Sequence, residues 1–162
     1  MCHDTSMELA LVELIDLFPF HLVISPDLRI AQAGRSLSRL CSELQPGARL
    51  AQHFRLLRPA QEWSPEIMQR ANSLVMIENI DNRLTLKGEL RRLPKQGMNL
   101  FIGVPWISSL SELQQRGMLI SDFPPYEPIS DYLFLLQAKN DALAETERLA
   151  AAVAAQRQEL SI

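Results

Sequence analysis

Three strand-like segments follow one another between residues 74 and 104, with only short polar turns between them. The segments are LVMIE (74–78), LTLKGELRRL (84–93) and MNLFIGV (98–104). Their leucine, β-branched and aromatic residues favour extended backbone, while Asn, Asp, Pro and Gly occupy the turns. Because links this short join neighbouring antiparallel strands, the pattern predicts three such strands in one sheet, and the rest of the chain must fold around them.

Two further strands are predicted near the N-terminus. FHLVI at 20–24 and LRIAQA at 28–33 have strand-like composition, and the turn Ser25-Pro26-Asp27 between them is short enough for an antiparallel hairpin. The preceding stretch, MELALVELIDLF at 7–18, predicts a helix with one broad apolar face, which Pro19 ends. This helix makes residues 1–19 the first predicted segment of the chain.

Helical spacing returns between the second and third strands. Residues 36–44 and 50–57 each predict a short helix, and Ser64-Pro65 opens another through about residue 73. The order is therefore a helix, two strands, several short helices and three strands. This order predicts an α+β chain with a PAS-like, five-stranded antiparallel sheet and flanking helices over residues 20–128. A generic α+β sandwich fits the same pattern.

The last strand leads directly into a capped helix. Pro105 stops the strand, and Ser109 precedes Glu112 by three positions, the spacing at which a hydroxyl and a carboxylate satisfy the first free N–H groups of a helix. Gly117 closes this helix where a left-handed residue is least costly. The block supplies neither a nucleophile nor metal ligands, so it predicts architecture and no reaction.

Residues 131–160 contain neither glycine nor proline and predict one long helix within the third segment, 129–162. At about 1.5 Å per residue such a helix reaches roughly 45 Å, longer than a small domain needs. One series has the alternating three-and-four spacing of a coiled-coil seam: Leu136, Lys139, Leu143, Thr146, Ala150, Val153, Arg157 and Leu160. Polar residues interrupt it, and a parallel register through Leu135, Ala142 and Leu149 competes with it. A coiled coil and a solvated helix both fit this pattern.

Charge and composition exclude several classes of protein. The chain has 162 residues, 47% of them hydrophobic, and a net charge of −3, which fits one soluble domain without the basic stripe that nucleic acid requires. Cys2 and Cys41 are too few for a disulfide framework, so we expect a reducing, cytoplasmic setting. The longest apolar runs fall far short of the roughly 20 residues of a membrane span, so we expect no membrane contact.

Candidate chemistry is sparse. His3, His21 and His53 are far apart without zinc spacing. His21, in an apolar strand, and His53, beside Phe54, are each better interpreted as a hydrogen-bonded structural histidine. Arg35 and Arg39, one helical turn apart, could bind a small anion at the start of that helix, but the simpler interpretation is that they pair with nearby carboxylates or lie in solvent. We therefore predict no catalytic, metal-binding or cofactor-binding residue and no cofactor.

Two tryptophans leave a further alternative open. Trp63 and Trp106 either stack on a planar ligand or lie at the rim of the core. A PAS-type sensor that binds its own small ligand or cofactor in the sheet cavity is thus the alternative to a purely regulatory domain.

Two blocks carry a resemblance to a known family. FPFHLVISPDLRIAQAGRSLSRLC (18–41) and LFIGVPWISSLSELQQRGMLISDFP (100–124), with HFRLLRP (53–59) between them and the helix after Asp131, resemble the H-NOX-associated domain, also called the heme-NO-binding-associated domain. That PAS-like module lies between the heme domain and the cyclase of soluble guanylate cyclases, and it occurs in bacterial sensor histidine kinases. The resemblance spans roughly residues 14–160.

The resemblance implies a regulatory, non-enzymatic domain. Such a domain forms a homodimer and relays a nitric oxide or oxygen signal from an H-NOX heme domain to an output domain through a coiled coil, without binding heme itself. The parent protein implied is a sensor histidine kinase first and a nucleotide cyclase second. Apolar helical faces would form the dimer interface, with these residues: Leu9, Leu11, Val12, Ile15, Leu136, Leu143 and Val153.

Overall fold

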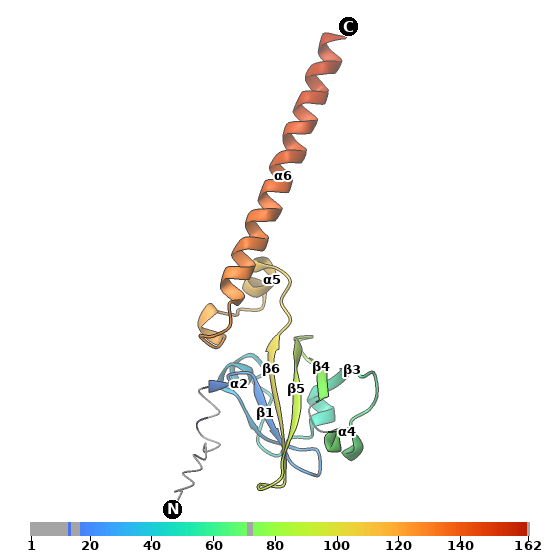
Figure 1. Ribbon diagram of the computed structural model, residues 1–162, viewed down its shortest axis with the longest axis vertical. Coiled ribbons are helices and arrows are strands. Elements are labelled where there is room, and N and C mark those ends of the chain that lie inside the picture. The colour runs from blue at the N-terminus through green and yellow to red at the C-terminus, as the bar shows by residue number, and fades with distance from the viewer. Residues whose placement is uncertain (1–12, 14–16, 71–72, 162) are drawn as a thin grey trace, which may run out of the picture. The chain divides into compact units, whose positions relative to one another are not determined.

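The computed structural model describes residues 13, 17–70 and 73–161, which form parts of two compact units (Figure 1). The first unit comprises Met1–Trp106 and Ser121–Pro125, and the second comprises Ile107–Ile120 and Tyr126–Ile162. Most of the helix predicted at residues 7–18 lies outside the described residues, so that prediction stays untested.

The described part of the first unit contains an antiparallel sheet and short helices. Its elements are β1 (His21–Ile24), β2 (Ile30–Ala33), α2 (Arg35–Leu40), α3 (Leu50–His53), β3 (Phe54–Arg58), α4 (Pro65–Gln69), β4 (Ser73–Asn79), β5 (Thr85–Leu93) and β6 (Met98–Pro105). The strands form one sheet in the order β2-β1-β6-β5-β4-β3, and each neighbouring pair is antiparallel. The predicted α+β class, with helices after the second strand, is confirmed.

The sheet has six strands, where the sequence predicted five. The predicted helix over residues 50–57 ends at His53, and β3 follows it and pairs with β4 at the edge of the sheet. Phe54 and Leu56 are buried while Arg55 between them is exposed. This alternation has the period of a strand, and the pairing with β4 supplies the backbone hydrogen bonds that a single helical turn cannot.

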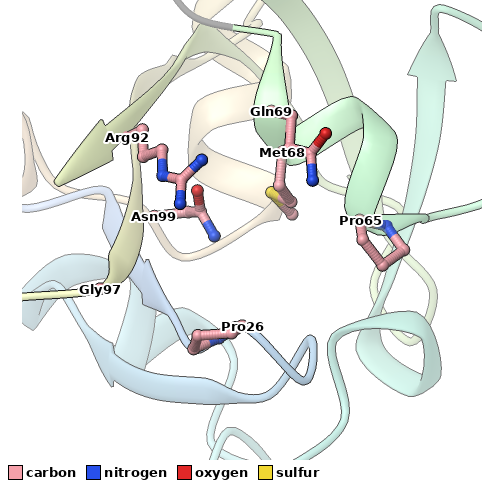
Figure 2. A pocket seen from close by; sticks show the side chains of 7 residues that line it. All are labelled: Pro26, Pro65, Met68, Gln69, Arg92, Gly97 and Asn99. Atoms are coloured by element: carbon pink, nitrogen blue, oxygen red, sulfur yellow. The ribbon is translucent and has the colours of Figure 1, made fainter. Parts of the chain in front are cut away.

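One face of the sheet carries the core. Cross-strand pairing places Leu22, Phe101 and Leu90 in one row, and each is at most 2% exposed. The next row along the strands in the direction of the β5–β6 turn is Ile24, Asn99 and Arg92, so the same face ends in two polar residues beside a small pocket (Figure 2). Directly paired residues on neighbouring strands lie on the same face of a sheet, so the strand register alone shows that Ile24, Asn99 and Arg92 share this face.

The second unit contains α5 (Leu110–Gln115) and α6 (Ile129–Leu160), and α5 packs against α6. The predicted cap of α5 is confirmed, because the backbone N–H of Glu112 donates to Ser109 Oγ at 3.1 Å and Gly117 has a φ of +66°. The Glu112 carboxylate accepts from the Ser108 N–H, a hydrogen bond that lowers the pKa of Glu112. The long predicted helix is present as the 32 residues of α6.

His21 is a structural histidine, as predicted. It is fully buried in β1, where Nδ1 lies 2.7 Å from the Phe18 carbonyl oxygen and Nε2 lies 2.9 Å from Gln32 Nε2. A ring that donates from Nδ1 to the carbonyl can accept from the Gln32 amide only while it is neutral. Burial lowers the pKa of His21 below its ordinary value of 6.5, and the bond to Phe18 opposes this shift only in part.

Stability should therefore fall at mildly acidic pH. The unfolded chain binds a proton at His21 near pH 6.5 while the folded chain resists it, so this contribution to stability is complete above pH 6.5 and is lost as the pH falls below it. Urea unfolding at pH 7.5 and 5.5 should show a larger loss in the parent chain than in His21→Gln. An NMR titration that gives His21 a pKa of 6.5 or higher would contradict this.

Candidate functional site

Hydrogen bonds and an ion pair join two segments that are far apart in the sequence. These segments are α2 and the residues that precede α6. The Ser36 hydroxyl donates to the Asp122 carbonyl oxygen at 2.6 Å, and Arg39 Nε donates to Asp122 Oδ1 at 3.1 Å. A second guanidinium nitrogen of Arg39 contacts Asp122 Oδ2, which makes the pair bidentate. Arg35 Nη1 adds a hydrogen bond to the Ser121 carbonyl oxygen at 3.3 Å. We call this set the α2–Asp122 contact.

The two charges of this contact have unequal access to water. The Asp122 side chain is 7% exposed, whereas the Arg39 side chain is 46% exposed. Loss of the cation would leave the buried carboxylate charge uncompensated and would be costly, whereas the half-exposed guanidinium can be hydrated if it loses its partner. Pairing with a nearby carboxylate is confirmed for Arg39, whereas Arg35 forms an exposed hydrogen bond to a carbonyl oxygen.

Close backbone packing fixes the start of α2. The N–H groups of Ser36 and Leu37 both donate to the Pro19 carbonyl oxygen at 3.1 Å. A Cβ atom on Gly34 would lie 2.2 Å from that same oxygen, so only glycine fits. Beside this point the Phe20 and Phe123 rings, both buried, pack with centroids 5.7 Å apart. The segment that leads toward α6 is therefore fixed by polar and apolar contacts.

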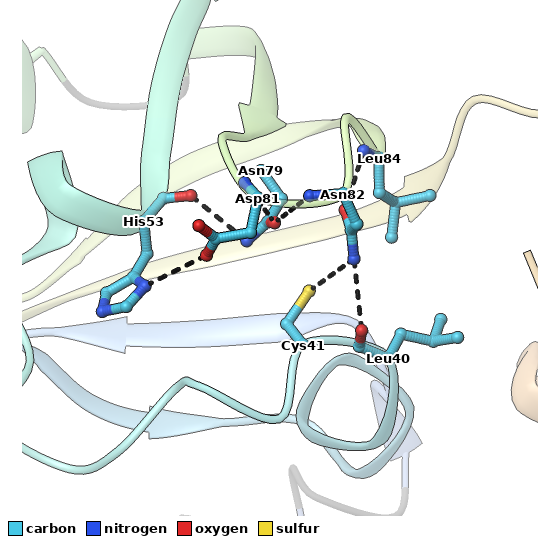
Figure 3. Close-up of polar contacts among 7 residues, drawn as sticks. All are labelled: Leu40, Cys41, His53, Asn79, Asp81, Asn82 and Leu84. Atoms are coloured by element: carbon cyan, nitrogen blue, oxygen red, sulfur yellow. Dashed lines mark hydrogen bonds and ion pairs between the residues drawn. The ribbon is translucent and has the colours of Figure 1, made fainter.

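A second polar cluster surrounds the turn between β4 and β5 (Figure 3). Asn79 Oδ1 accepts from the N–H groups of Asp81 and Asn82, each at 3.1 Å, while Asn79 Nδ2 donates to the His53 carbonyl oxygen. Asn82 Nδ2 donates to the Leu40 carbonyl oxygen at 3.1 Å. The turn thus joins the ends of α2 and α3 through hydrogen bonds from its side chains to backbone groups.

His53 and Cys41 also contribute side chains to this cluster. His53 Nδ1 lies 3.7 Å from Asp81 Oδ2, which is longer than a hydrogen bond. Cys41 is buried, and its burial raises the pKa of the thiol to about 11, so the reactive thiolate is scarce near neutral pH. His53 was predicted to be a hydrogen-bonded structural histidine, and its Nδ1 has no hydrogen-bond partner among the described residues.

The two tryptophans occupy structural and surface positions. Trp63 Nε1 donates to the Phe54 carbonyl oxygen at 2.9 Å, which ties the loop before α4 to β3. Trp106 is 56% exposed, with Lys87 Nζ 5.2 Å from its ring centroid. Neither ring faces the other across a shared cavity in the described structure, since the pockets they line have different walls.

The predicted interface residues on α6 are accessible to a partner. Leu143 and Val153 are 55% and 49% exposed, and Leu136 is partly exposed. Leu135 and Leu149, in the competing register, are 71% and 55% exposed. The other predicted interface residues, Leu9, Leu11, Val12 and Ile15, lie outside the described residues. Sequence reasoning missed Asp122, because nothing local marks a carboxylate whose partner lies 83 residues away.

Two searches of the described residues bear on function. Nowhere among them do three or more His, Cys, Asp or Glu side chains gather as metal ligands would. Of the helices in residues 13, 17–70 and 73–161, none has the length and apolar character needed to cross a bilayer.

Comparison with known proteins assigns the chain to a family. The model of the family described as "Heme NO binding associated" matches residues 7–82 and 78–160, so the chain belongs to that family. Soluble guanylate cyclase subunits are relatives. The chain is 29% identical over 131 residues to subunit alpha-1 of Bos taurus, and 26% identical over 129 residues to subunit alpha-2 of Homo sapiens.

A third relative is the head-specific guanylate cyclase of Drosophila melanogaster, 24% identical over 132 residues. These matches cover 73–74% of this chain and 18–20% of each relative. The chain therefore spans about a fifth of the relatives' length. Family membership and these relatives support a role in signal transduction.

Proposed function

We propose that this chain is a regulatory dimerisation and signal-transmission domain. It relays a nitric oxide or oxygen signal from an H-NOX heme domain to a C-terminal output domain, a histidine kinase or a guanylate cyclase. The domain acts in the cytoplasm, carries no catalytic residue of its own and needs no cofactor. In this proposal residues 20–128 form the PAS-like domain that receives the signal from the H-NOX domain, and residues 129–162 form the signalling helix.

One observation carries the proposal: a 32-residue helix follows closely after a residue held by the sheet domain. Asp122 is bound by α2, and only residues 123–128 separate it from the first residue of α6. A displacement of α2 would therefore act on the chain just before the helix begins. Interfaces and packed segments of this kind switch between discrete arrangements, which is how small shifts become large ones.

Dimerisation through α6 is the second step of the proposed relay. Leu143 and Val153 belong to one seam of α6, and Leu135 and Leu149 to a second, and all four are about half exposed or more. Pairing with a second copy of α6 would cover either set. Because both seams are interrupted or short, neither dominates, and a change between them provides two states for a relay to select.

Binding of an H-NOX heme domain tests the relay directly. We would titrate the chain calorimetrically with the H-NOX domain from the same polypeptide or the adjacent gene, in its unliganded ferrous and nitric oxide-bound forms. The proposal predicts saturable binding whose affinity differs between the two forms, since a signal can shift an equilibrium only by its differential affinity.

Two results would count against the relay. One is an absence of binding at high micromolar concentrations of both proteins, and the other is equal affinity for the two heme forms. As a matched control, Glu89→Gln changes a charge on the sheet without touching α2 or Asp122 and should leave the affinity difference intact.

A further inference from the structure

A small pocket lies at the end of the core face, where the β5–β6 turn, the β1–β2 turn and α4 meet (Figure 2). Its volume is about 100 Å³, and its lining residues are Pro26, Pro65, Met68, Gln69, Arg92, Gly97 and Asn99. A water molecule occupies about 30 Å³ of liquid, so the space suits a molecule of only a few non-hydrogen atoms. The pocket is separate from the α2–Asp122 contact.

The polar groups of this pocket are mainly hydrogen-bond donors. Arg92 and Asn99 are paired across β5 and β6, so their side chains lie on the same face of the sheet, and the Gln69 amide faces them from α4 in Figure 2. The lining includes one cation and no carboxylate. Asp27, next to Pro26, has its carboxylate engaged by Ser25 and by Arg29 Nε at 3.2 Å. The balance of charge favours a monoanion.

Asn99 gives the pocket its specific character. The residue is 8% exposed and is paired with the fully buried Ile24, and its side chain lines the pocket. An amide that is open to the pocket can form a hydrogen bond there with water or with a ligand, whereas a leucine at this place would only extend the apolar row. A ligand in the pocket would accept a hydrogen bond from this amide in place of water.

The apolar residues of the lining further restrict the class of ligand that fits. Met68, Pro26 and Pro65 add apolar atoms to the lining. Arginine binds planar oxyanions through two parallel N–H groups, and an adjacent amide can add a third hydrogen bond. We propose that the pocket formed by Arg92, Asn99 and Gln69 binds a small monocarboxylate with a short apolar group. This site is independent of the proposed relay function.

NMR titration of the ¹⁵N-labelled chain with sodium acetate and sodium propionate tests this assignment. Chloride would be exchanged for the carboxylate at constant ionic strength. We expect saturable shifts of the Asn99 and Gln69 side-chain amides and of the Gly97 N–H, with a dissociation constant of about 1 mM, as suits so small a ligand.

Two neighbouring arginines provide a matched comparison. Arg92→Gln should weaken acetate binding about tenfold or more, because it removes a charge-assisted pair of hydrogen bonds. Arg91→Gln makes the same change of charge on the opposite face, where Arg91 pairs with Glu89 at 2.9 Å, and should leave the affinity within about twofold. Asn99→Asp should abolish binding while the fold is retained, since its own carboxylate would engage Arg92.

Several outcomes would overturn the proposal. Shifts that grow linearly without saturation indicate no site. An equal loss of affinity in Arg91→Gln and Arg92→Gln indicates general charge attraction. Nitrate or inorganic phosphate that binds as tightly as propionate indicates that the pocket recognises charge without the carboxylate and its apolar group.

Discussion

Replacing Arg39 with methionine is expected to destabilise the first unit by about 3 kcal/mol. The change leaves the Asp122 carboxylate, whose side chain is 7% exposed, without its cation. Removing one partner of a buried ion pair costs about 3–5 kcal/mol, and the lower end applies because the Arg39 side chain is 46% exposed. Urea unfolding followed by the fluorescence of Trp63 and Trp106 would measure it, since both tryptophans belong to the first unit.

Two further variants of the α2–Asp122 contact test whether the loss of stability comes from the unpaired buried carboxylate. Asp122→Asn should cost less, about 1.5 kcal/mol, because the freed guanidinium can turn to water. Arg35→Met removes only an exposed bond to a carbonyl oxygen and should cost about 0.5 kcal/mol. If Arg39→Met proves no more harmful than Arg35→Met, the α2–Asp122 contact does not hold the segment before α6, and the proposed route to that helix fails.

The second large effect is expected for Gly34→Ala, with a loss of about 3 kcal/mol in unfolding free energy. The added Cβ would lie 2.2 Å from the Pro19 carbonyl oxygen, the acceptor of two N–H groups of α2. The obstacle is backbone, so no side-chain rotation can relieve it, and α2 must move. The φ of Gly34 is −62°, so lack of space is the whole cause.

Gly97→Ala is the matched control for this prediction. Gly97 has open space around the Cβ position but a φ of +65°. Its replacement should therefore cost only the left-handed conformation, about 1–2 kcal/mol. Equal losses in Gly34→Ala and Gly97→Ala, measured by the same urea unfolding, would argue against close packing of α2 on Pro19.

The sequence predicted the strands well where local patterns are strong. β1, β2, β4, β5 and β6 all lie within two residues of their predicted bounds, because alternation and turn residues act over short distances. β3 was missed because Leu50, Phe54 and Leu57 satisfy helical spacing equally well. Its strand conformation depends on pairing with β4, a partner about 20 residues further along the chain.

The candidate site was less predictable for the same reason. The anion paired with Arg39 is Asp122, and register places Arg92 beside Asn99, yet neither pair is marked in the sequence by local spacing. The expected pairing with a carboxylate is confirmed for Arg39 and not for Arg35, and the sequence did not identify the carboxylate. On α6, the pattern identified exposed apolar residues, but the choice between its two seams depends on a second chain.

Light scattering of the chain at high micromolar concentration tests the central claim most directly, that two copies associate through α6. We predict twice the mass of one 18.4 kDa chain, reduced to a single chain in Leu143→Asp/Val153→Asp. Leu135→Asp/Leu149→Asp, the matched change in the competing register, should also lower the mass, because neither seam dominates. A parent chain that shows the mass of one copy at every concentration would contradict the account.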